Sequence, residues 1–175
     1  NPMRVLFALQ DGEIGYKFAA FIAELSEQMN SIEIIIQTRR TPANDYLKKH
    51  SALQFVEFSQ ENVYMSLIKS DVHATVYSTT AIEALSLGRQ NILVNIDGLS
   101  IAHLSSKLEQ NPFTRIVDSV PSFIAAIQEI DTIDKQAVEF KNEADVVRAT
   151  RLVELKARES VEDFSGHAHQ TGTFY

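Results

Sequence analysis

The sequence predicts an α/β protein built on a doubly wound, mainly parallel sheet, and three observations lead to this fold class. Short apolar segments of strand length alternate with segments of helical period. The length of 175 residues suits a single domain. Glycines and polar turn residues follow most of the apolar segments. Strands that alternate with helices form a parallel sheet covered on both faces, and right-handed crossovers make such a sheet Rossmann-like.

The strands are predicted from runs of apolar and β-branched residues. Residues 4–10 (RVLFALQ) form the first run, which Asp11-Gly12 ends. Residues 31–38 are rich in isoleucine, and residues 53–58 alternate between apolar and polar side chains. Further strands are predicted at residues 73–78, 91–96 and 114–117, and the last of these has the weakest pattern.

The helices are predicted from apolar residues at helical spacing and from capping residues. Residues 15–29 carry an apolar face of this kind. Thr41 followed by Pro42 marks the start of a short helix that reaches about residue 50. Further helices are predicted at residues 61–69, 80–87, 100–110, 121–130 and 132–159, the last of them capped by Thr132.

Residues 1–159 are therefore predicted to form one Rossmann-like domain. Residues 160–175 lack a core pattern, so we expect a flexible tail there. The apolar segments are of strand length, far short of the roughly 20 residues that a membrane span needs. The chain contains no cysteine, which suits a reducing compartment, and we expect a cytoplasmic protein.

Ligands of doubly wound folds bind at the carboxyl ends of the strands, where the strand order reverses. Chemically useful residues follow five of the predicted strands, so we expect them along one rim of the sheet. They are Asp11, Gly12 and Gly15; Arg39 and Arg40; Ser59 and Asn62; Ser78, Thr79 and Thr80; and Asp97 and Gly98. Lys17, Arg39 and Arg40 supply positive charge that could bind a diphosphate.

The stretch from Val76 to Gly88 combines a buried strand, a hydroxyl-rich turn and a short helix. Free backbone N–H groups and the positive end of the dipole make a helix start an anion site. Glu83 lies one turn inside, where its carboxylate could bind a ribose or sugar diol. A second interpretation is a capping box, in which Thr80 caps the N3 amide and Glu83 binds the Thr80 amide. The two roles are not exclusive.

This stretch has the form Ser-Thr-x-x-x-Glu-Ala-x-x-x-Gly followed by an apolar strand. It resembles the C-terminal half of GT-B glycosyltransferases, in the form seen among surface-polysaccharide enzymes, and the order of elements over residues 4–157 agrees. The resemblance implies a domain that binds the nucleotide-sugar donor. Ser78, Thr79 and Thr80 would face the diphosphate and Glu83 the ribose. Lys17, Arg39 and the turn at Gly12 would complete the donor site.

The same resemblance implies a second domain, which binds the acceptor and for which this chain has no counterpart. We expect the chain to be a part of a longer enzyme. On its own, it should bind nucleotide without transferring sugar. The family's glycine-rich turn is replaced here by threonines, and a second acidic residue is missing. Two alternatives stay open: half of a nucleotide-sugar 2-epimerase, whose Ser-Gly-Gly-x-x-Glu-Glu turn is absent, and a non-catalytic α/β interaction domain.

Other ligand classes are disfavoured. The turn Asp11-Gly12-Glu13-Ile14-Gly15 lacks the GxGxxG spacing of NAD and FAD sites, and the chain has no P-loop. A net charge of −7 without a basic stripe disfavours nucleic acid as a partner. Without cysteine, His167 and His169 alone do not define a metal site. We therefore expect no metal and no cofactor beyond the nucleotide-sugar substrate.

Overall fold

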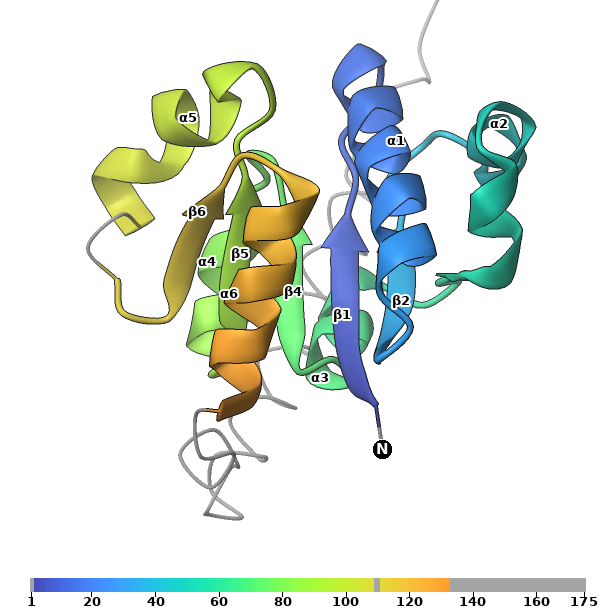
Figure 1. Cartoon of the computed structure of the whole chain (residues 1–175). Coiled ribbons are helices and arrows are strands. Elements are labelled where there is room, and N and C mark those ends of the chain that lie inside the picture. Colours follow the sequence, from blue (N-terminus) through green and yellow to red (C-terminus); the bar gives the residue numbers. More distant parts are fainter. Residues whose placement is uncertain (1, 109–110, 133–175) are drawn as a thin grey trace, which may run out of the picture. The chain divides into compact units, whose positions relative to one another are not determined.

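The computed structural model describes residues 2–108 and 111–132, which form a parallel six-stranded sheet with helices on both faces (Figure 1). The strands are β1 (Met3–Ala8), β2 (Ile32–Gln37), β3 (Glu57–Phe58), β4 (Val72–Thr75), β5 (Gln90–Val94) and β6 (Thr114–Val117). The helices are α1 (Glu13–Gln28), α2 (Ala43–Lys49), α3 (Val63–Ile68), α4 (Thr80–Ser86), α5 (Leu99–Leu108) and α6 (Val120–Thr132). Two short 3₁₀ helices are η1 (Ser51–Phe55) and η2 (Ile96–Gly98). The predicted doubly wound parallel sheet is confirmed.

The sheet has an apolar core on each face, because alternate side chains of a strand point to opposite sides. On one face Phe7 of β1 packs against Phe18 of α1 and Phe123 of α6, with ring centroids 5.9 and 5.5 Å apart. Figure 1 shows α1 and α6 in front of this face. On the other face Leu93 of β5 packs with Ala81 of α4 and with residues of α5.

The strand order is β3-β2-β1-β4-β5-β6, and the side on which successive strands are added changes between β1 and β4. The chain first builds outward from β1 through β2 to β3, and then returns to the other side of β1 with β4. Val5 of β1 is in register with Ile34 of β2 on one side and with Val72 of β4 on the other. This central position is the topological switch point at which doubly wound folds bind ligands.

The third strand differs most from the prediction. Residues 53–58 were expected to be extended, but Ser51–Phe55 form η1 and the strand keeps only Glu57–Phe58. Leu53 is fully buried, whereas Phe55 is 86% exposed. In a strand these two side chains would lie on the same face and be buried together. The alternating pattern here instead belongs to a short 3₁₀ helix that buries only Leu53.

The last predicted helix also differs at its start. Thr132 was expected to cap a helix over residues 132–159, but it is the final residue of α6. Residues 133–159, and the tail predicted at 160–175, lie outside the described residues. The expected domain limit at residue 159 therefore stays a prediction.

Candidate functional site

A cleft of about 370 Å³ lies at the carboxyl edge of the sheet, at the switch point between β1 and β4. Three segments that are distant in sequence meet in it, and each directly follows a strand. The lining residues are Leu9, Gln10 and Asp11 after β1, Arg39 after β2, and Tyr77, Ser78 and Thr79 after β4. The sheet topology thus gathers charged and hydroxyl groups where the fold class places a ligand.

Arg39 supplies the positive charge of this cleft. The residue is exposed, and no carboxylate of the described residues lies within 4.0 Å of its guanidinium group. Asp11 lines the same cleft and accepts a 3.4 Å hydrogen bond from the Thr41 hydroxyl. The guanidinium group is therefore available to an anionic ligand, for which it offers planar, bidentate hydrogen bonds.

Gln10 and Thr75 join the two strands on either side of the switch point. Thr75 Oγ1 donates to the Ala8 carbonyl over 2.9 Å, so its single hydrogen is used and it must accept from Gln10. Gln10 Nε2 donates to it over 2.9 Å, and the Ser78 amide donates to it over 3.4 Å. This arrangement fixes the turn after β4 against the end of β1 at the floor of the cleft.

The predicted capping box at the start of α4 is wrong. Thr79 occupies the N-cap position and makes no side-chain capping bond. The Thr80 hydroxyl lies 2.9 Å from Ser78 Oγ and 3.0 Å from Nε2 of the buried His73, so it points toward the sheet. The Thr80 amide donates to Ser78 Oγ over 3.3 Å, and the serine thus occupies the place that the capping box gave to Glu83. Glu83 accepts instead from the Tyr64 hydroxyl over 3.5 Å.

His73 is at the centre of a buried polar network between β4, β5 and α4. Its Nδ1 lies 2.8 Å from Asn91 Oδ1, and Asn91 Nδ2 donates to the Ala81 carbonyl over 2.7 Å. His73 and Asn91 are register partners, and neither side chain is exposed. Burial lowers the pKa of His73 from 6.5 to about 4, although the bond to Asn91 acts in the opposite direction. The imidazole is therefore neutral at pH 7.

The neutral state of His73 decides the direction of these hydrogen bonds. Because the Asn91 amide nitrogen is held by Ala81, the asparagine oxygen must face the ring. Nδ1 of His73 then carries the hydrogen of the neutral ring, and Nε2 is left as an acceptor for the Thr80 hydroxyl.

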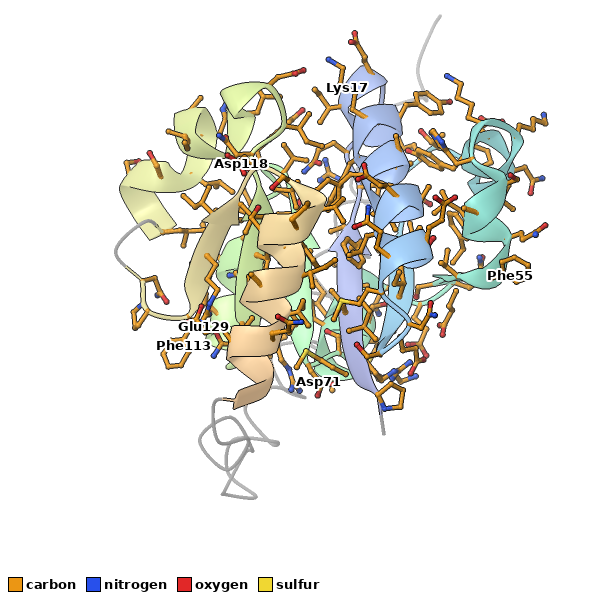
Figure 2. The ribbon with its side chains drawn as sticks, in the orientation of Figure 1. Lys17, Phe55, Asp71, Phe113, Asp118 and Glu129 are labelled. Carbon is orange, nitrogen blue, oxygen red and sulfur yellow. The ribbon has the colours of Figure 1, made fainter. Side chains whose placement is uncertain are left out.

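Lys17 lies at the same edge of the sheet but is already paired. Its Nζ is 2.6 Å from Asp97 Oδ2 and 3.2 Å from Glu13 Oε1. The hydrogen bonds to Asp97 and then to Glu13 raise the pKa of Lys17 above its usual value of 10.5. Figure 2 shows the lysine near the N-terminal start of α1, above the carboxyl ends of the strands. A ligand phosphate would have to compete with Asp97 for this cation.

Gly12 directly follows Asp11 and occupies the N-cap position of α1. Its φ of +76° is in the region that favours glycine, and a Cβ there would meet no atom within 4 Å. The backbone at the start of this 16-residue helix is therefore open on its outer side.

The structure therefore separates the seven residues predicted for the donor site. Arg39, Ser78 and Thr79 line the cleft together, and Gly12 is adjacent to it in the chain. Lys17, Thr80 and Glu83 contact the groups described above and do not line the cleft. Among the other rim residues, Ser59 Oγ lies 2.8 Å from Ser66 Oγ, and Asn62 caps α3.

Sequence reasoning missed three residues of the cleft, Leu9, Gln10 and Tyr77. All three were included in predicted strands that proved too long: β1 ends at Ala8 and β4 at Thr75. The Tyr77 ring packs on His103 of α5, with centroids 5.1 Å apart. A glutamine and a tyrosine at the carboxyl ends of two apolar runs were the available signal.

No cluster of three or more histidine or acidic residues in the described ranges could hold a metal ion. None of the helices within these ranges is long and apolar enough to cross a membrane.

Solved structures give the decisive comparison. The chain aligns with the wall teichoic acid polymerase TagF, solved after a soak with CDPG, over 93% of this chain and 42% of that one, at 14% identity and a TM-score of 0.58. It aligns with the glycotransferase of kitacinnamycin over 89% of this chain and 39% of that one, at 17% identity and a TM-score of 0.53. The described residues share the GT-B fold of these two glycosyltransferases.

This GT-B domain spans about two fifths of the length of those two proteins. No protein-family model matches its sequence, and a search of curated proteins gives no match either. The likeness therefore rests on the course of the chain, and at these identities it establishes the fold.

Proposed function

We propose that this GT-B domain binds the nucleotide-sugar donor of a glycosyltransferase. The observation that carries the proposal is the cleft at the switch point, where Arg39 meets the hydroxyl groups of Ser78 and Thr79. A guanidinium group with no carboxylate partner among the described residues, beside the Thr79 hydroxyl, suits a diphosphate, which offers only acceptor oxygens. The shared fold supports the proposal. The TagF structure adds support, because that neighbour was solved after a soak with CDPG.

The diphosphate would be stabilised from two sides of the cleft. Arg39 would bind its oxygens on the β2 side, and the Thr79 hydroxyl would donate to it on the β4 side. The open backbone at Gly12 adds the partial positive charge of the α1 N-terminus. These groups would stabilise the negative charge that develops on the nucleoside diphosphate as it leaves the sugar.

Lys17 and Glu83 could bind the donor only after each leaves its present partner. Lys17 reaches the diphosphate only if the ligand displaces Asp97, and Glu83 reaches a ribose only if it leaves Tyr64. The acceptor site and the general base are assigned to a second domain, in keeping with the two fifths of the neighbours' length that this chain spans.

Calorimetric titration of the 175-residue chain with UDP, GDP and CMP tests the proposal, with NAD as the control ligand. We expect one nucleotide to bind with saturation and Arg39→Ala to weaken that binding about tenfold, the effect of losing a charge-assisted bond of about 1.4 kcal/mol. Arg40→Ala is the matched control, because Arg40 is the next residue, carries the same charge and does not line the cleft. Binding of no nucleotide by the folded chain, or equal losses in both variants, would reject the proposal.

A further inference from the structure

The proposed donor site alone does not account for the buried pair His73 and Asn91. Both residues are fully buried in adjacent strands, where apolar side chains are the rule. Burying a polar group costs free energy unless it is hydrogen-bonded, and both side chains here are fully engaged. Apolar residues of similar size would fill the same space more cheaply, so the pair calls for a role beyond packing.

A continuous series of contacts joins this pair to the cleft. Asn91 is anchored on the Ala81 carbonyl and holds the His73 ring, whose Nε2 faces the Thr80 hydroxyl at 3.0 Å. Because the Thr80 hydroxyl gives its single hydrogen to His73, the Ser78 hydroxyl donates to Thr80 Oγ1 over 2.9 Å, and Ser78 Oγ accepts from the Thr80 amide over 3.3 Å. Ser78 is the member of the series that lines the cleft.

We propose that His73 is a positioning residue for the donor site: through Thr80 it fixes Ser78 Oγ, whose hydrogen is directed at Thr80, as an acceptor for a hydroxyl group of the nucleotide. The inference rests on the proposed function of the cleft. Thr80, which the sequence placed against the diphosphate, acts instead as the link between the histidine and the serine. The serine hydroxyl is thereby held before the ligand arrives, and binding does not have to order it.

Thr80→Val tests the link because it removes the hydroxyl group that joins His73 to Ser78. Valine has nearly the shape of threonine but lacks the hydroxyl, whereas Thr80→Ser keeps it. With the best-binding nucleotide from the titration above, we expect Thr80→Val to weaken affinity about fivefold and Thr80→Ser to stay within twofold. His73→Gln should weaken affinity to a similar extent as Thr80→Val.

The same substitutions in a Ser78→Ala background separate positioning from general damage to the fold. If His73 and Thr80 act through the serine, Thr80→Val and His73→Gln change the affinity less than twofold once Ser78 is absent. Ser70→Ala is the control for lost stability, because its buried hydroxyl donates to the Leu67 carbonyl and it does not line the cleft. This variant should lower the unfolding midpoint and leave the affinity unchanged.

The outcomes are distinct. Binding of no nucleotide by the unmodified chain rejects the proposed function, and this inference with it. If nucleotide binds, unchanged affinity in Thr80→Val rejects the positioning role alone, as do equal losses with and without Ser78. Should His73→Gln not fold, the Thr80 and Ser78 variants decide the question, because they lie on the surface side of the same series of contacts.

Discussion

Gly15 is the glycine of the described residues beside which a side chain has no room. A Cβ there would lie 2.0 Å from the Gln10 carbonyl oxygen and 2.9 Å from the Tyr46 hydroxyl. The first of these atoms is backbone at the edge of the cleft, so α1 could accept a side chain only by moving away from the end of β1.

Gly15→Ala should therefore destabilise the domain by about 3 kcal/mol, the upper end of the usual cost of overpacking. Urea unfolding followed by circular dichroism measures this difference. Ala20→Gly, at an exposed position of the same helix, is the comparison and should cost only about 1 kcal/mol through helix propensity. Equal stability of Gly15→Ala and the unmodified chain would show that α1 can move away freely.

His73 makes stability depend on pH. Its pKa is about 4 in the folded chain and 6.5 when unfolded, so the unfolded state binds a proton first as the pH falls. The contribution of the neutral ring is complete above about pH 6.5 and is lost between about pH 6.5 and 4. At pH 5 we expect a loss of about 2 kcal/mol relative to pH 7.

Urea unfolding at pH 7 and pH 5 measures this loss. His73→Gln carries no group that titrates in this range, so the difference between the two pH values should shrink by about the same 2 kcal/mol. A pH difference of the same size in both proteins would assign the effect to other residues.

Two short helices on the same face of the sheet differ in how they begin. The amide of Met65 in α3 donates to the Asn62 side chain over 3.0 Å, whereas Thr79 at the start of α4 makes no such bond. Asn62→Ala should cost about 1 kcal/mol, and Thr79→Ala should stay within about 0.5 kcal/mol. Thermal unfolding of the two variants makes the comparison, and a larger loss in Thr79→Ala would contradict the cap assignment.

The hydrophobic pattern was enough to predict most elements, because the central strands are short runs buried on both faces and the long helix α1 buries side chains at helical spacing. It failed at residues 53–58, where a single buried leucine in a 3₁₀ helix gives the alternation of a strand. It failed again at Thr80. The sequence pattern of a capping box was present, but a buried histidine 7 residues earlier in the chain binds the same hydroxyl. Local sequence does not report such a tertiary partner.

The arrangement of the whole sheet decided which predicted site residues meet. The sequence placed residues after five strands at one rim, but it did not specify the strand order. With the reversal between β1 and β4, the cleft takes residues that follow β1, β2 and β4. Asp97, after β5, binds Lys17 instead of lining the cleft. Strand order is a property of long-range packing, so these assignments needed the structure.

A nucleotide that binds this cleft should stabilise the whole domain, because the unfolded chain has no such site. At a free concentration of about 100 times its Kd, we expect about 2.7 kcal/mol of added stability and a clear rise in Tm. Differential scanning calorimetry measures this rise, with NAD as the control ligand. The same nucleotide concentration should give a smaller rise with Arg39→Ala, and an identical rise would place the ligand elsewhere.

The two-residue length of β3 has a consequence for self-association. Another chain can pair with a sheet edge through the edge strand's unpaired amides and carbonyls. The two-residue β3 exposes very few of them. At the opposite edge, β6 is four residues long and carries Arg115, which binds Glu129 and Gln90. Charged side chains on edge strands hinder the docking of a further strand. Along the described part of the chain, both margins of the sheet thus oppose growth into fibrillar aggregates.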